Sequence, residues 1–130
     1  MNNKKKPILT TDGLITRENK ILMVKRDIEP FKKFWVLPGG HVDYNEEVEQ
    51  AIKREVKEEL AINTKIKNLI GVYSDPKRDP RYHSVSVAYE LKRQGGEISL
   101  NEEASAYDFF HMDNLPRKVG FDHRKIIKDL

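Results

Sequence analysis

Residues 40–62 read GHVDYNEEVEQAIKREVKEELAI, and this stretch decides much of the fold. Its aliphatic residues recur at helical spacing, which predicts a helix from about Glu46 to Leu60 with an apolar stripe formed by Val48, Ile52, Val56 and Leu60. At about 100° per residue, Glu55 and Glu59 project at the edge of that stripe and not on the opposite face. Two acidic side chains are therefore expected close to the core.

Three carboxylates, Glu55, Glu58 and Glu59, stand at positions i, i+3 and i+4 of this helix. Like charges at this spacing repel one another, and the repulsion grows when the groups are partly removed from water. One interpretation is a solvated acidic face, which is the usual role of acidic helical residues. The overlap with the apolar stripe instead favours a cluster of hard oxygen ligands for Mg²⁺ or Mn²⁺.

The flanking sequence predicts strands and one further helix. Apolar and alternating runs separated by turn residues favour strands at residues 8–16, 20–26, 34–37, 65–74, 84–92 and 107–112. A short amphipathic helix is expected at residues 121–130. Strands mixed with only two helices predict an α/β fold in which the helices pack on a mixed sheet.

Length and composition exclude several classes of protein. A chain of 130 residues corresponds to one domain, and the absence of Cys excludes disulfide scaffolds and thiol nucleophiles. The net charge of +3 is only mildly basic, so Lys4, Lys5 and Lys6 are expected to form a solvated tail and not a nucleic-acid-binding arm. No apolar run suits a membrane helix or a signal peptide, so we expect a cytoplasmic protein that contacts no membrane.

The stretch from Gly40 to Ile62 resembles the Nudix box, GX5EX7REUXEEXGU, in which U is a bulky aliphatic residue. Six fixed positions and both aliphatic positions match, and the preceding WVLPGG at residues 35–40 is similar to the strand that leads into the box in this family. The resemblance implies a single Nudix hydrolase domain over residues 1–130, with residues 1–6 as a flexible tail. The implied fold is an α/β/α sandwich with a mixed β-sheet.

The family resemblance assigns metal ligands. It implies that Glu55, Glu58 and Glu59 bind Mg²⁺, for which Mn²⁺ is a substitute, and that the carbonyl oxygen of Gly39 joins them. Such an ion would offset the charge of a diphosphate and lower the pKa of a bound water. The proton of that water would pass to a carboxylate, and any of the three Glu residues is a candidate base.

Three other residues receive supporting roles from the resemblance. Arg54 and Glu46 are expected to orient and neutralise the ligands without binding the metal. An ordinary surface ion pair is the alternative for them. Glu103, in the loop before the last strand, is a candidate base or extra ligand, and a plain solvated loop is the alternative there.

The helix ends of the box depart from the family pattern. Asp43 with Glu46 has the form of a capping box, and Asn45 is an alternative cap that also tolerates positive φ. Ala61 replaces the final Gly of the box, which normally adopts a left-handed conformation that costs Ala roughly 1 kcal/mol. One way to end the helix without that Gly would use Asn63.

A second stretch, GVYSDPKRDPR at residues 71–81, resembles small prokaryotic ADP-ribose pyrophosphatases. Its two prolines stiffen a loop that would present Lys77, Arg78 and Arg81 to substrate phosphates, although a charged surface turn is the alternative. The implied activity is Mg²⁺-dependent hydrolysis of a nucleoside diphosphate linked to another group, with ADP-ribose giving AMP and ribose 5-phosphate. Alternatives are a nucleoside triphosphate or dinucleoside polyphosphate hydrolase and a non-catalytic nucleotide sensor. The expected partner is a small nucleotide, and a homodimer is a further possibility.

Overall fold

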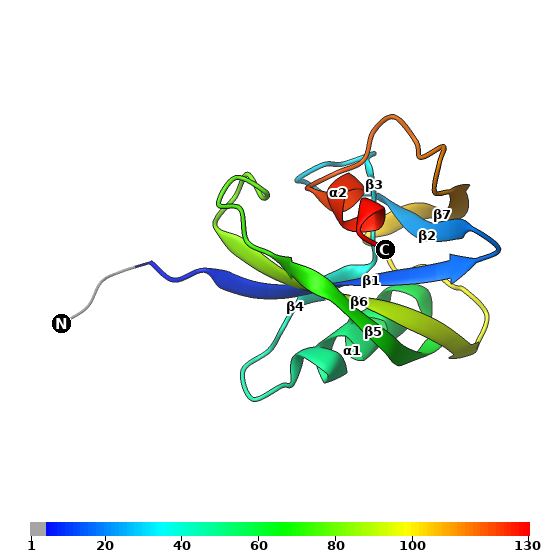
Figure 1. Cartoon of the computed structure of the whole chain (residues 1–130), viewed down its shortest axis with the longest axis horizontal. Helices are drawn as coiled ribbons and strands as arrows, with labels where there is room; N and C mark the ends of the chain where they lie inside the picture. Colours follow the sequence, from blue (N-terminus) through cyan, green and yellow to red (C-terminus); the bar gives the residue numbers. More distant parts are fainter. Residues whose placement is uncertain (1–4) are drawn as a thin grey trace.

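The computed structural model describes residues 5–130, so the predicted tail at residues 1–6 lies mostly outside the described residues. A seven-stranded mixed sheet has the order β3-β2-β1-β6-β5, with β4 paired to β1 and β7 paired to β2 (Figure 1). β1 and β6 run parallel, and the other pairs are antiparallel. The elements are β1 (Ile8–Arg17), β2 (Lys20–Arg26), β3 (Trp35–Val36), β4 (Gly39–His41), α1 (Val48–Leu60), β5 (Asn63–Tyr73), β6 (Ser84–Gly95), β7 (Ala104–His111) and α2 (His123–Lys128).

Two hydrophobic clusters lie on opposite faces of the sheet. Side chains alternate along a strand, so Leu22 and Val24 of β2 join the cluster under α1, whereas Ile21 and Met23 join the cluster under α2. Figure 1 shows the two helices on opposite sides of the strands. The predicted α/β/α arrangement with a mixed sheet is therefore confirmed. No helix within residues 5–130 is long and apolar enough to cross a membrane.

The start of α1 differs from the prediction. The helix begins at Val48, and Glu47 is its N-cap, with its backbone N–H donating to Gln50 Oε1 at 3.0 Å. Glu46 instead accepts a hydrogen bond from the backbone N–H of Asp43 at 3.0 Å, which closes the loop before the helix. The helix therefore starts two residues after the predicted Glu46, and the predicted Asp43 cap is wrong by four residues, about one turn. Asn45 has φ 65°, a conformation that Asn adopts more readily than most residues.

α1 ends in the left-handed backbone conformation that the glycine of the box normally adopts. Ala61 itself is left-handed, with φ 62° and ψ 20°, and its N–H donates to the Lys57 carbonyl oxygen at 2.9 Å. Asn63 is the first residue of β5, so the expectation that Asn63 ends the helix is wrong. The chain pays a conformational cost at Ala61 that glycine would avoid.

Ala61→Gly is expected to stabilise the protein by roughly 0.5–1 kcal/mol, because glycine adopts positive φ without a clash of Cβ. Urea unfolding of the variant measures the change. Ala51→Gly is the matched control, since Ala51 is buried inside α1 and the same substitution there should destabilise the protein. A lower midpoint for Ala61→Gly would contradict the assignment of strain to this residue.

Candidate active site

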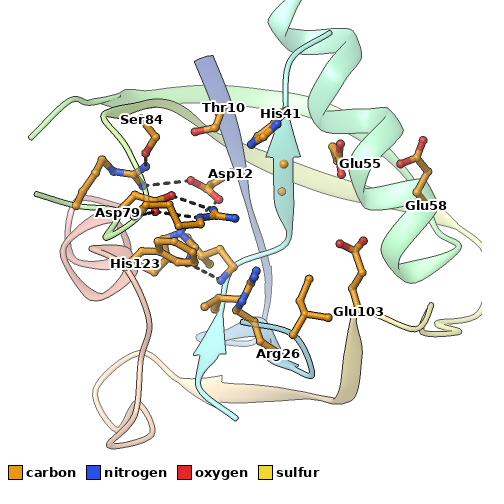
Figure 2. A pocket seen from close by; sticks show the side chains of 18 residues that line it. Thr10, Asp12, Arg26, His41, Glu55, Glu58, Asp79, Ser84, Glu103 and His123 are labelled. Atoms are coloured by element: carbon orange, nitrogen blue, oxygen red, sulfur yellow. Dashed lines mark hydrogen bonds and ion pairs between the residues drawn. The ribbon is translucent and has the colours of Figure 1, made fainter. Parts of the chain in front are cut away.

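A cavity of about 350 Å³ is lined by residues of β1, β2, β4 and α1, so it brings distant parts of the chain together (Figure 2). α1 contributes acidic side chains to one side, and the loop between β5 and β6 contributes charged groups to the other. The lining residues include Thr10, Asp12, Arg26, Gly39, Gly40, His41, Glu55, Glu58, Arg78, Asp79, Arg81, Ser84, Glu103 and His123.

Gly39 and Gly40 begin β4, a separate short strand that follows the strand predicted at residues 34–37. Asp12 of β1 pairs with Gly39, and Thr11 pairs with Gly40. A Cβ atom on Gly39 would lie 2.1 Å from the carbonyl oxygen of Thr11, and one on Gly40 would lie 2.4 Å from the carboxyl carbon of Glu55. Both distances are far below contact distance, so glycine at these positions allows β4 to approach β1 and α1.

Arg54 connects the acidic residues of the box. Its Nε and Nη2 donate to the two oxygens of Glu46 at 2.6 and 2.9 Å, and its Nη1 donates to Glu55 Oε1 at 3.0 Å and to Glu58 at 3.3 Å. Nη2 also donates to the carbonyl oxygen of His41 in β4, at 3.0 Å. The hydrogen bonds from Arg54, with one from the Asp43 backbone, lower the pKa of Glu46 to about 2. Arg54 thus fixes the carboxylates relative to β4.

Glu59 and Glu55 carry negative charge in a poorly solvated place. Glu59 is half-buried and accepts a hydrogen bond from the Gly39 N–H of β4 at 3.4 Å. Burial raises the pKa of Glu59 well above its usual range, and the nearby Glu55 and Glu103 raise it further. Burial also raises the pKa of Glu55, although Arg54 opposes this effect. A cation placed among these oxygens would relieve the repulsion.

The donor set suits a hard divalent cation. Carboxylate and carbonyl oxygens are the ligands of Mg²⁺ and Mn²⁺ in proteins. Among residues 5–130, no group of three carboxylate or imidazole side chains already forms a ligand set for a metal ion. Backbone oxygen, water and substrate phosphate oxygens would therefore complete the coordination, which is the usual pattern for Mg²⁺.

Glu59→Gln is expected to stabilise the metal-free protein. Because the pKa of Glu59 is raised in the fold, its charged form destabilises the folded state above that pKa, and the penalty disappears as pH falls below it. The variant should melt a few degrees higher than wild type at pH 8 in EDTA, with the difference vanishing at acidic pH. Glu102→Gln, in an exposed loop, is the control. A lower melting temperature for Glu59→Gln at every pH would contradict this reading.

Glu103 lies on the same side of the cavity as the carboxylates of α1 and points toward them, as Figure 2 shows. Its carbonyl oxygen accepts from the Asp27 N–H at 2.8 Å, and its own N–H donates to Asn101 Oδ1 at 3.0 Å. The backbone is therefore held at both ends of the residue while the side chain is exposed. The neighbouring Glu102 does not line the cavity.

Three cations of the loop at residues 74–83 were predicted to contact substrate phosphates, and two of them, Arg78 and Arg81, line the cavity. Lys77 lines a separate hollow of about 600 Å³ with Tyr73 and Lys125. The Arg78 side chain is 3% exposed, and Asp122 accepts from its Nε and Nη2 at 2.9 and 2.7 Å. Arg78 therefore faces the cavity as a buried member of an ion pair, and Lys77 points elsewhere.

Arg81 is the exposed cation of this loop that lines the cavity. Its side chain is 42% exposed, and its Nε and Nη2 donate to the two oxygens of the buried Asp79 at 3.1 and 2.9 Å. The guanidinium also lies over the ring of Tyr82, 4.8 Å from the centroid. Asp79 and Tyr82 thus hold the plane of Arg81 at the cavity wall.

Sequence analysis missed a buried polar network on the same wall. His123 Nδ1 accepts from the Leu37 N–H at 2.9 Å, which places the ring proton on Nε2, 3.4 Å from Asp12 Oδ1. Burial would raise the pKa of Asp12, but His123, Ser86 and Arg78 together lower it. The available signal was a carboxylate, Asp12, within the predicted strand at residues 8–16, which carries no other charge. Arg26 and His41 also line the cavity and were not singled out.

The sequence matches the NUDIX domain family over residues 6–130, and the chain belongs to this family. It is 49% identical over 123 residues to an ADP-ribose pyrophosphatase of Methanocaldococcus jannaschii, a match that covers 95% of this chain and 72% of that protein. The predicted Nudix hydrolase of the ADP-ribose pyrophosphatase type is thereby confirmed.

Solved structures agree with this assignment. The MutT NUDIX hydrolase of Burkholderia pseudomallei superimposes with a TM-score of 0.90 at 30% identity, covering 97% of this chain and 99% of that one. The NUDIX domain of Shewanella oneidensis NrtR, solved with ADP-ribose, gives a TM-score of 0.83 at 25% identity, covering 97% and 87%. The fold predicted from the box is therefore the fold of these proteins.

Proposed function

We propose that this Nudix hydrolase cleaves the diphosphate of ADP-ribose to give AMP and ribose 5-phosphate. One observation carries the proposal: carboxylates of α1 and a guanidinium-bearing wall face each other across a single cavity. This arrangement suits an anionic diphosphate and a divalent cation together. The similarity to the Methanocaldococcus enzyme supports ADP-ribose as the substrate.

Mg²⁺, or Mn²⁺ in its place, would be held by Glu55, Glu58, Glu59 and the carbonyl oxygen of Gly39. When bound, the ion supplies charge compensation for the diphosphate and lowers the pKa of water. The chain supports this through Arg54, which orients Glu55 and Glu58, and through Gly40, which leaves room for the Glu55 carboxylate.

Glu103 is the proposed general base. The water oxygen forms a bond to phosphorus, and the bond from phosphorus to the bridging oxygen breaks with its electron pair leaving on the departing phosphate. The proton of the water passes to the Glu103 carboxylate, which lines the cavity beside the carboxylates of α1. Arg81, held by Asp79 and Tyr82, binds a phosphate oxygen of the substrate.

A panel of substrates tests the proposed reaction. Rates are measured on ADP-ribose, other nucleoside diphosphate sugars, dinucleoside polyphosphates and nucleoside triphosphates, with AMP and phosphate as readouts. The proposal predicts the highest kcat/KM for ADP-ribose, with AMP as the product. A higher value for triphosphates or dinucleotides would favour the alternative hydrolase.

A nucleotide sensor without catalysis is the second candidate, favoured by the ADP-ribose bound to the NrtR domain. Tight binding of ADP-ribose without turnover in Mg²⁺ would support the sensor. The presence of Glu55, Glu58 and Glu59 together argues for catalysis, because binding alone does not require three adjacent carboxylates.

A further inference from the structure

Arg26 is a cavity-lining cation at the end of a row of core side chains. Leu22, Val24 and Arg26 follow one another at every second position of β2, and the first two belong to the cluster under α1. The pairing of β2 with β7 shifts register between Lys25 and Arg26, and such a shift changes the direction of a side chain. In Figure 2, Arg26 points from the end of this strand into the cavity.

The position of Arg26 is fixed by its backbone and by one side-chain contact. Its N–H donates to the Phe34 carbonyl oxygen at 2.9 Å, and its carbonyl oxygen accepts from the Lys33 N–H at 2.7 Å. Its Nε donates to the Pro30 carbonyl oxygen at 2.7 Å, and the guanidinium lies 5.5 Å from the centroid of the Phe121 ring. These contacts direct the two terminal nitrogens toward the cavity.

The charge of Arg26 is not matched by a close carboxylate. Arg26 takes part in none of the ion pairs formed between residues 5 and 130. Burial lowers the pKa of its guanidinium, and the positive charge of Arg81 lowers it further, while Glu103, Glu59 and Asp79 act in the opposite direction. Two cations that share a cavity wall are stabilised by an anion that contacts both.

We propose that Arg26 and Arg81 together bind one phosphate group of the substrate's diphosphate, from the wall that faces the carboxylates of α1. The inference rests on the proposed function for the identity of the substrate. Arg81 uses Nε and Nη2 for Asp79, and Arg26 uses Nε for Pro30. The remaining terminal nitrogens suit the charge-assisted, forked contacts that guanidinium groups make with phosphate.

Arg26→Gln tests the proposal through steady-state kinetics with ADP-ribose. The expected result is a rise of about 10–100-fold in KM and the same weakening of inhibition by inorganic pyrophosphate, because a hydrogen-bonded charge is lost. Arg17→Gln is the matched control, since Arg17 also lies over a phenylalanine ring, that of Phe109, but lines other surface hollows. Equal KM and inhibition constants in the two variants would overturn the proposal.

Two further variants keep the test decisive. Arg26→Lys keeps the positive charge but lacks the paired N–H donors of a guanidinium, so it should raise KM several-fold. An unchanged KM in this variant would overturn the proposal even if Arg26→Gln fails to fold. Arg81→Gln combined with Arg26→Gln should show effects that do not add, because both side chains hold one phosphate. Additive effects would contradict the shared site.

Calorimetry in EDTA separates this inference from the proposed reaction. If wild type fails to hydrolyse ADP-ribose once Mg²⁺ is supplied, the reaction is wrong, and the Kd values of wild type and Arg26→Gln measured in EDTA still test Arg26. If ADP-ribose does not bind at all, inorganic pyrophosphate provides the same comparison. Weaker binding by Arg26→Gln supports the role of Arg26, and equal binding overturns it.

Discussion

Glu58→Gln is expected to lower kcat for ADP-ribose by about 10³-fold, the loss that several kcal/mol of transition-state charge stabilisation implies. The Glu58 side chain is 55% exposed, and its contacts are hydrogen bonds of 3.3 Å from Arg54. Glutamine keeps the size of the side chain and one oxygen, so the fold should not change. What the substitution removes is one negative charge from the proposed cation site.

The experiment compares kcat at saturating Mg²⁺ with the circular dichroism spectrum and the melting temperature. Glu97→Gln is the control, because it removes the same charge from a residue that does not line the cavity. A variant with native melting and wild-type turnover would show that Glu58 is not a ligand. If Glu58→Gln loses both activity and structure, the same measurements on Glu55→Gln and Glu59→Gln test whether the carboxylates of α1 are metal ligands.

Gly40→Ala is expected to lower kcat by about 10²-fold or more with a small loss of stability, because misplacing a reacting group by about 1 Å has a cost of this size. The added Cβ would lie 2.4 Å from the carboxyl carbon of Glu55 and 2.5 Å from its Oε2. β4 is paired to β1 and cannot withdraw easily. The flexible end of Glu55 would therefore move, taking its oxygens out of position.

Gly95→Ala is the matched control, since a Cβ at Gly95 would meet open space. It should retain both activity and stability. The diagnostic result for Gly40→Ala is a fall in kcat that exceeds any change in the urea midpoint. Wild-type kcat in Gly40→Ala would mean that the position of Glu55 does not matter to catalysis.

Periodic elements of this protein were predictable because their signal is local. The helical spacing of aliphatic residues located α1 and placed Glu55 and Glu59 near the core, and the structure shows both side chains half-buried, with Glu59 accepting a hydrogen bond from the Gly39 N–H. The apolar run from Ile21 to Val24, preceded by turn residues, located β2 at residues 20–26 without error. The resemblance to the Nudix box then predicted the α/β/α fold, because the box forms the same strand, loop and helix within the fold of this family.

Features that depend on tertiary contact were not predictable. β4 has three residues, two of them glycine, so it carries no periodic pattern, and only its pairing with β1 defines it. The hydrogen bonds of Arg78 to Asp122, 44 positions along the chain, bury Arg78, and Lys77 beside it lines a different hollow. Similarly, Asp12 and His123 meet only because β1 and the start of α2 share one wall.

Calorimetric titration with Mn²⁺ measures whether the carboxylates of α1 bind a divalent cation. Wild type and Glu58→Gln are titrated at neutral pH with AMP present. We expect saturable uptake by wild type and affinity weaker by about tenfold or more in the variant, because a ligand charge is lost. No uptake by wild type, or equal affinity in both proteins, would contradict metal binding by these carboxylates.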